Sequence, residues 1–139
     1  MILAITLSPT FDLTYKVDQI NMHEVNIVSA KNFEPSGKGY NVAFDLTQEG
    51  FKSATISPIP ESQLGHVWGY MSREKVKTLT SKSSNEIRLH TTVVDGKDAT
   101  KFNEKSEKLS EIELEDLVNL ISETVKSEKV SWIALCGSV

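Results

Sequence analysis

Residues 1–7 form an almost unbroken apolar run, and this run constrains the fold more than any other segment does. Such a run is typical of a strand that is covered on both faces of a parallel sheet. A second apolar run spans residues 130–136. Between the two, apolar residues recur with helical spacing in residues 39–49, in residues 63–76 and after Ser110. Buried strands that alternate with helices predict an α/β fold with a mostly parallel sheet.

Each expected helix has one apolar stripe that would face the core. The first helix would bury Val42, Ala43 and Leu46 and end at Gly50. The second would bury Leu64, Val67, Trp68 and Met71. The third begins with a capping box of Ser110 and Glu113 and would bury Leu114, Leu117, Val118, Ile121 and Val125. A short strand is expected at residues 52–57, followed by an extended break at Pro58-Ile59-Pro60.

Residues 13–17 and 25–33 alternate apolar and polar residues, which suggests half-exposed strands that do not fit inside a buried sheet. Residues 86–94 and 97–102 are expected to form a hairpin with an Asp95-Gly96 turn. We expect these strands in a small separate β layer, with lid strands within about residues 12–33 and 86–103. Residues 1–139 are expected to form a single domain.

Composition excludes several classes of protein. The net charge of −4 and the pI near 5.4 argue against nucleic-acid binding, which needs a basic face. Cys136 is the single cysteine, so no disulfide can form within the chain. Because it lies in an apolar run, it is expected to be a core thiol. The first seven residues lack a basic flank and are too short for a signal peptide or a membrane span. We therefore expect a cytoplasmic protein with no membrane partner.

The Gly37-Lys38-Gly39 segment precedes the first expected helix. Glycines let the backbone approach a ligand closely, and a helix N-terminus offers unpaired N–H groups and a positive dipole end. With the charge of Lys38, the segment is a candidate cradle for phosphate or for sugar oxygens. The alternative is a solvated loop that starts a helix. A Walker-type P-loop is excluded, because Gly39 stands where serine or threonine is needed.

Three features are expected at the carboxyl ends of the sheet strands, where α/β proteins place their clefts. They are Asp12, the Gly37-Lys38-Gly39 loop and Gly137-Ser138. The histidines His23, His66 and His90 lack the spacing of paired metal ligands, and no metal site is expected.

The sequence resembles the start of the PfkB carbohydrate kinases, in the branch of 1-phosphofructokinase and tagatose-6-phosphate kinase. The resemblance is carried by residues 6–12, 23–29, 35–43, 87–89, 102–104 and 135–138. It implies a ribokinase-like three-layer core with a mostly parallel sheet and a small β-sheet lid, of which only the N-terminal half is present. It also implies transfer of the ATP γ-phosphate to a hydroxyl of a sugar phosphate.

Residue by residue, the resemblance implies a substrate site. Asp12 would accept hydrogen bonds from sugar hydroxyls, while the backbone of Gly37 and Gly39, with Asn41, would hold the sugar. Lys38 and Arg88 would bind the phosphate already on the substrate, and Ser138 would add a hydroxyl contact. The alternatives are that Asp12 caps a turn and that Arg88 is a solvated charge. Ser36 stands where the branch usually has glycine, so the loop would be strained if that residue needed a positive φ.

The resemblance also implies which parts this chain lacks. The family's catalytic base, its anion hole and its nucleotide site lie beyond the segment that matches. No catalytic or cofactor-binding residue is therefore expected here, ATP and Mg²⁺ would belong to the full-length protein, and the isolated chain is expected to be inactive. The alternative is a non-catalytic or degenerate relative that binds a sugar phosphate. Which phosphosugar is bound is left open.

A strand at residues 130–136 would leave one edge unpaired and one apolar face uncovered. Such edges favour pairing with another chain. We expect a homodimer, aggregation or a missing C-terminal half that covers this edge.

Overall fold

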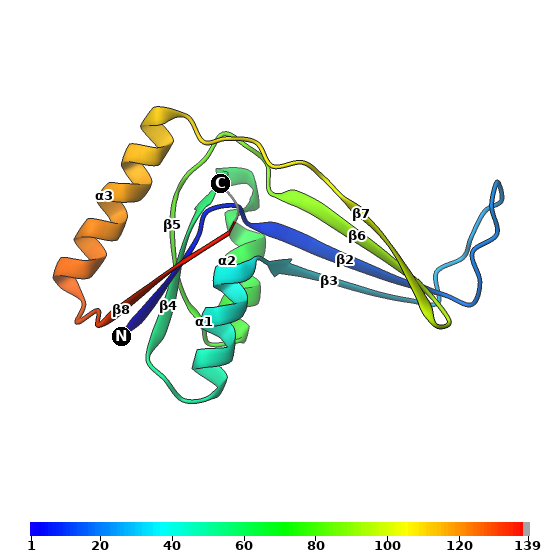
Figure 1. Cartoon of the computed structure of the whole chain (residues 1–139), viewed down its shortest axis with the longest axis horizontal. Coiled ribbons are helices and arrows are strands. Elements are labelled where there is room, and N and C mark those ends of the chain that lie inside the picture. Colours follow the sequence, from blue (N-terminus) through cyan, green and yellow to red (C-terminus); the bar gives the residue numbers. More distant parts are fainter. Residues whose placement is uncertain (138–139) are drawn as a thin grey trace.

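The computed structural model describes residues 1–137 and places them in two four-stranded sheets and three α-helices (Figure 1). The first sheet is fully parallel and has the order β5-β4-β1-β8. Its strands are β1 (Ile2–Thr6), β4 (Ser53–Ile59), β5 (Lys77–Lys82) and β8 (Trp132–Cys136). Leu3, Ala4 and Ile5 of β1 are fully buried or nearly so, because helices cover both faces of the sheet there.

The helices lie in two layers, one on each side of this sheet (Figure 1). On one face, α1 (Lys38–Gln48) and α2 (Leu64–Arg73, after a short 3₁₀ turn at Glu61–Gln63) bury Tyr40, Ala43, Val67 and Met71 against Ala4. On the other face, α3 (Glu111–Ser127) buries Leu117 against Leu3 and Ile5. The three-layer α/β core is therefore confirmed.

The second sheet extends away from this core (Figure 1) and has the order β3-β2-β6-β7. Its strands are β2 (Thr10–Val17), β3 (Ala30–Ser36), β6 (Arg88–Asp95) and β7 (Asp98–Asn103). β2 pairs with β3 in antiparallel and with β6 in parallel fashion. The expectation of a separate β layer is confirmed, although β3 begins later than residue 25, after an extended loop. The hairpin turn is Gly96-Lys97, with Gly96 at φ 60°, and not Asp95-Gly96, because Asp95 pairs with Asp98.

The first sheet differs from the sequence-based expectation in two ways. It contains β5, a strand that was not predicted, because its sequence KTLTSK lacks an apolar run and it lies at the edge of the sheet. The proline segment does not break β4, which continues through Pro58 to Ile59. Pro58 lies beyond the part of β4 that pairs with β1, so its missing N–H removes little from the sheet.

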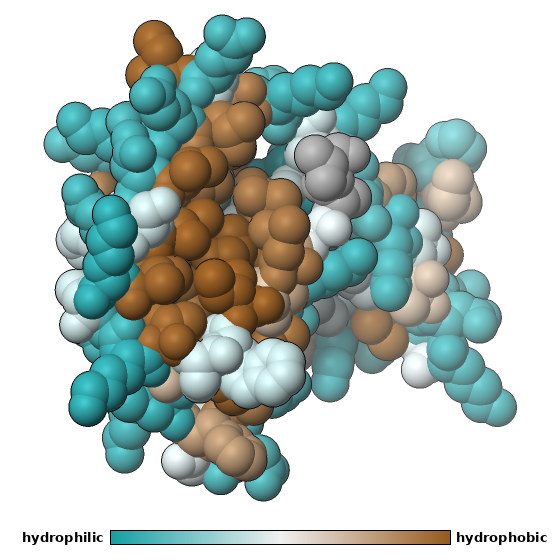
Figure 2. Space-filling model, turned by 60° about the vertical axis from the view of Figure 1, so that its left-hand side comes forward, coloured by the Kyte–Doolittle hydropathy of each residue, from teal (hydrophilic) through white to brown (hydrophobic). Residues whose placement is uncertain are grey.

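The expected burial near the carboxyl end was also wrong in part. Leu117 is buried, but Leu114, Val118 and Val125 of α3 are exposed, and so are Trp132, Ile133 and Leu135 of β8. Figure 2, which is turned to bring the α3 side forward, shows a continuous apolar area on this face. Trp68 of α2 is exposed as well. The capping box of Ser110 and Glu113 is confirmed. None of the helices within residues 1–137 is long and apolar enough to cross a membrane.

Candidate functional site

A cleft of about 200 Å³ lies where the end of β1 meets the second sheet and the start of α1. Five predicted site residues line it: Asp12, Gly37, Lys38, Asn41 and Arg88. They come from β2, from the start of α1 and from β6, so segments far apart in the sequence converge here. The other lining residues are Thr6, Ser8, Thr10, Ser36, His90 and Gly137.

The parallel pairing of β2 with β6 creates one wall of the cleft. Thr10 lies opposite Arg88, and Asp12 lies opposite His90. Because strand side chains alternate between the two faces, these four residues share one face of the second sheet. Thr10 Oγ1 donates to Asp12 Oδ1 at 3.1 Å, and His90 Nδ1 lies 3.8 Å from the same oxygen. Asp12 keeps 40% of its side-chain surface exposed, so its carboxylate remains accessible to a ligand.

Gly37 shapes the opposite wall. Its backbone, at φ 139° and ψ 152°, lies in a region that essentially only glycine adopts, and it is the N-cap of α1. A Cβ at Gly37 would lie 2.8 Å from Thr6 Cγ2. Gly37 provides no capping side chain, so the first-turn N–H groups of α1 remain available to a ligand beside Lys38. Ser36 precedes this turn as a strand residue without a positive φ, so the condition for strain at Ser36 is not met.

Gly39 has a structural role instead of lining the cleft. A Cβ there would lie 2.2 Å from Thr6 Oγ1 and 3.0 Å from the carbonyl carbon of Ile5. The absence of a side chain lets the first turn of α1 pack directly on the end of β1. Gly39 therefore places Lys38 and Asn41 at the cleft without contacting it.

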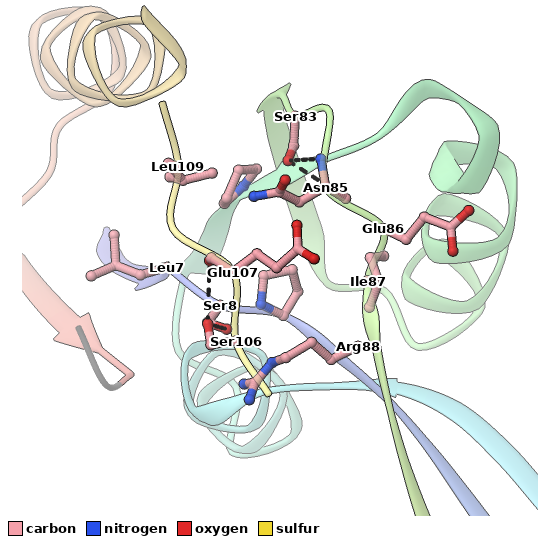
Figure 3. Close-up of a pocket in the computed structure, with 12 residues that line it drawn as sticks. Leu7, Ser8, Ser83, Asn85, Glu86, Ile87, Arg88, Ser106, Glu107 and Leu109 are labelled. Atoms are coloured by element: carbon pink, nitrogen blue, oxygen red, sulfur yellow. Dashed lines mark hydrogen bonds between the residues drawn. The ribbon is translucent and has the colours of Figure 1, made fainter. Parts of the chain in front are cut away.

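The segment that follows β7 positions Arg88 through hydrogen bonds to Glu104. Arg88 Nη1 donates to the Glu104 carbonyl at 3.3 Å, and the Glu104 carboxylate accepts the Leu89 N–H at 2.8 Å. Figure 3 shows Arg88 at the border of a small neighbouring pocket, with its guanidinium directed toward Ser8 and Ser106, whose hydroxyls are 2.9 Å apart. Arg88 Nε is buried and has no hydrogen-bond partner among residues 1–137, so it is a donor that a ligand can satisfy.

The sequence reasoning missed His90 and Thr10 as cleft residues. Both lie two positions from a predicted site residue on the same strand, and this spacing could have indicated them. What the sequence does not show is the parallel β2–β6 pairing, which brings His90 to Asp12. Ser138, also predicted for the site, lies outside the described residues.

The charges of the cleft favour an anion that also carries hydroxyl groups. Lys38 and Arg88 supply two positive charges, and Asp12 supplies one carboxylate. Within residues 1–137, no group of three or more His, Cys, Asp or Glu side chains is placed to hold a metal ion. The arrangement can bind a phosphate through the two cations and accept hydroxyl hydrogen bonds through Asp12.

Comparison with known proteins finds similarity to kinases that act on phosphosugars. No protein-family model matches the chain. A tagatose-6-phosphate kinase of Staphylococcus epidermidis is 34% identical over 84 residues, which are 60% of this chain and 26% of that kinase. The same match occurs in a second strain of that species.

Solved structures match over nearly the whole chain. Escherichia coli phosphofructokinase-2 in complex with fructose-6-phosphate has a TM-score of 0.83 at 24% identity, over 99% of this chain and 45% of that one. The same enzyme in complex with potassium is 27% identical over 88% of this chain and 40% of its own, with a TM-score of 0.72. The chain thus spans less than half the length of the relatives it matches. It has the ribokinase-like fold and is similar to a tagatose-6-phosphate kinase and to phosphofructokinases, which agrees with the resemblance to the PfkB carbohydrate kinases.

Proposed function

We propose that this chain is the substrate-binding portion of an ATP-dependent phosphosugar kinase, and that its cleft binds the sugar-phosphate acceptor. The observation that carries the proposal is the convergence of Asp12, Lys38, Asn41 and Arg88 in one cleft at the end of β1. The relatives are named as kinases of tagatose 6-phosphate or as phosphofructokinases, which agrees with an acceptor of this class.

Each group of the cleft has a role in this proposal. Arg88 and Lys38, with the uncapped N–H groups of α1, bind the phosphate of the substrate. Asp12 accepts hydrogen bonds from two sugar hydroxyls and so orients the ring, and Asn41 contributes an amide to the same sugar. Thr10 keeps the Asp12 carboxylate in place through its hydrogen bond. The second sheet, which carries Asp12 and Arg88, acts as the lid over the bound sugar.

Phosphoryl transfer needs a nucleotide, Mg²⁺ and a group that accepts the hydroxyl proton. In this proposal, ATP and Mg²⁺ are bound by the rest of the full-length protein, and no residue of the described chain is assigned to them. The 139-residue chain is then expected to bind a phosphosugar without turning over ATP. One relative has been solved as a tetramer, and self-association of the full-length protein is part of the same proposal.

Isothermal titration calorimetry on the purified chain tests the site. Fructose 1-phosphate, fructose 6-phosphate and tagatose 6-phosphate would be titrated separately, with fructose and inorganic phosphate as controls. We expect at least one phosphosugar to bind more tightly than either control, because it engages both the cations and Asp12. The absence of heat and of thermal stabilisation with all three phosphosugars would refute the proposed site.

A further inference from the structure

His90 lies in the wall of the cleft, two residues after Arg88 on β6. Its side chain is 26% exposed, and its Nε2 is buried with no hydrogen-bond partner among residues 1–137. Nδ1 lies 3.8 Å from Asp12 Oδ1, which is within the range of an ion pair but too long for a hydrogen bond. Neither nitrogen of the imidazole is therefore held by a hydrogen bond within the part of the chain that the structure describes.

An imidazole without hydrogen bonds is free to turn. The last torsion of a histidine side chain is broad and roughly two-fold. Rotation about the Cβ–Cγ bond exchanges the two sides of the ring, so either nitrogen of His90 can be presented to the cleft that the ring lines. Buried polar groups in folded proteins nearly always have a partner. A ligand in the cleft, which has a volume of about 200 Å³, can be that partner.

The charges that share the cleft with His90 come from three elements. Asp12 lies opposite His90 on β2, and Arg88 is on the same face of β6. Lys38 lines the same cleft from the start of α1. Without a ligand, these two cations and one carboxylate leave one net positive charge, which disfavours protonation of a neighbouring imidazole.

The strand on the other side of His90 adds little to this balance. His90 pairs with Asn103 of β7, which carries no charge. Lys101 lies two residues away on the same face of β7, and the Glu104 carboxylate accepts the Leu89 N–H outside the cleft. These two charges have opposite signs and are exposed, so solvent and salt screen them.

β3 adds one more carboxylate, which is turned away from the cleft. Glu34 pairs with Asp12, but its carboxylate accepts a hydrogen bond from the Tyr70 hydroxyl of α2 at 2.9 Å. Glu34 lines a separate pocket against α1 and α2. The protonation of His90 therefore depends on Asp12, on the two cations of the cleft and on the charge of the ligand.

A phosphosugar reverses the balance of charge in the cleft. At neutral pH its phosphate carries close to two negative charges, because the second pKa of a phosphate ester is about 6. Bound between Arg88 and Lys38, the phosphate makes the cleft net negative and favours a further cation there. Among the residues that line the cleft, His90 is the one whose side-chain type changes charge near neutral pH.

We propose that His90 takes up a proton from solvent when the phosphosugar binds, and then donates a hydrogen bond to the substrate phosphate as its third cationic ligand. In the bound state, the imidazolium lies between the Asp12 carboxylate and the phosphate, and both stabilise its charge. A sugar without a phosphate leaves the cleft net positive, so His90 stays neutral and adds nothing to its binding. His90 thus determines specificity for a phosphorylated sugar. This role rests on the proposed function, because it assigns a further ligand group to the same site.

Isothermal titration calorimetry in buffers of different ionisation enthalpy measures the number of protons exchanged on binding. The purified chain is titrated with fructose 1-phosphate, fructose 6-phosphate, tagatose 6-phosphate and fructose at about pH 7.5, where a phosphosugar is already almost fully dianionic. His90→Gln keeps a hydrogen-bond donor in the side chain but cannot titrate. His23→Gln is the matched control, because His23 is exposed in the loop between β2 and β3, outside the cleft.

We expect uptake of roughly 0.3–0.8 of a proton for each phosphosugar molecule that binds, and none for fructose. His90→Gln should abolish the uptake and weaken phosphosugar binding by about tenfold near pH 6.5, with a smaller loss near pH 8.5, where an imidazole is seldom protonated. His23→Gln should change neither the uptake nor the affinity. Circular dichroism melting shows whether both variants are folded.

Nuclear magnetic resonance of the unsubstituted chain tests the same proton without a variant. The ring carbon signals of His90 should move to imidazolium values when a phosphosugar is added, and should stay at neutral values with fructose. Phosphosugar binding that leaves these signals neutral would overturn the role of His90, and so would equal proton uptake in His90→Gln. Either result would leave the proposed function intact. Absence of phosphosugar binding to the unsubstituted chain would overturn the proposed function and the role of His90 together.

Discussion

Asp12 and His90 lie opposite each other in the parallel β2–β6 pair, with 3.8 Å between Asp12 Oδ1 and His90 Nδ1. The imidazole and Thr10 both approach the same carboxylate oxygen, so the position of the Asp12 side chain is determined by its two neighbours. Oδ2 remains for a ligand. Because one carboxylate oxygen of Asp12 is fixed and the other is free for a ligand, Asp12 is the first residue to substitute in a test of the cleft.

Asp12→Asn should weaken phosphosugar binding by about ten- to a hundredfold. The substitution keeps the shape of the side chain but removes its charge, and a hydrogen bond to a charged group contributes roughly 1.5–3 kcal/mol. Isothermal titration calorimetry would measure the change. Asp18→Asn is the matched control, because Asp18 is exposed and lies outside the cleft, and it should leave the affinity unaltered. Equal effects of the two substitutions would contradict a ligand role for Asp12.

Arg88→Gln should reduce the affinity for a phosphosugar by about tenfold or more, and should have little effect on the weak binding of unphosphorylated fructose. Arginine binds phosphate through paired donors, and glutamine offers neither the charge nor the paired geometry. The chain has one other arginine, Arg73, which stacks on Tyr70 outside the cleft. Arg73→Gln therefore serves as the control. If Arg88→Gln weakened both ligands equally, Arg88 would not be the phosphate ligand.

Part of this candidate site could be predicted from local sequence, whereas Asn41 and Arg88 were expected only from the resemblance to the PfkB kinases. Gly37 needs an unusual backbone conformation, and the helix after Gly37-Lys38-Gly39 follows from the apolar spacing. His90 could not be predicted as a cleft residue, since its position depends on a parallel pairing between strands about 80 residues apart. The alternation of apolar and polar residues in a strand does not indicate which distant strand it pairs with.

For the fold, too, local sequence patterns predicted some elements and missed others. The apolar runs that form β1 and β8 and the capping box of α3 indicated their elements correctly. β5 escaped prediction because an edge strand with mixed polarity has no distinct pattern. The burial of β8 was overestimated for a different reason. Apolar sequence indicates that a strand is suited to burial, but no segment among residues 1–137 covers Ile133 and Leu135 of β8.

Gly39→Ala should lower the free energy of unfolding by about 1–3 kcal/mol, the usual cost of forcing an atom into a packed core. The new Cβ would meet Thr6 Oγ1 at 2.2 Å and the backbone of Ile5 at 3.0 Å, and the backbone cannot move aside cheaply. Urea denaturation followed by circular dichroism would measure the change.

Gly69→Ala is the matched control for Gly39→Ala. Gly69 lies in the exposed interior of α2, and a Cβ there would meet nothing within 4 Å. This substitution should stabilise the chain by about 0.5–1 kcal/mol, because alanine favours a helix more than glycine does. If both substitutions were neutral or stabilising, α1 would not need its close approach to β1.

Glu113 should make stability depend on pH in the acidic range. Its carboxylate accepts hydrogen bonds from the Ser110 and Ser84 backbones and from their hydroxyls, and these bonds lower the pKa of Glu113 from 4.5 to about 2. Because the pKa is depressed in the folded state, the stabilisation by the ionised carboxylate is fully present above pH 4.5 and is lost as the pH falls toward 2.

Glu113→Ala should therefore lower the melting temperature at pH 7, and its difference in melting temperature from the original chain should shrink as the pH falls through this window. Glu115→Ala, an exposed change on the same helix, should show a small difference that does not converge in this way. If the difference in melting temperature caused by Glu113→Ala were as large at pH 2.5 as at pH 7, the ionised carboxylate would not stabilise the junction of α3 with the β5–β6 loop.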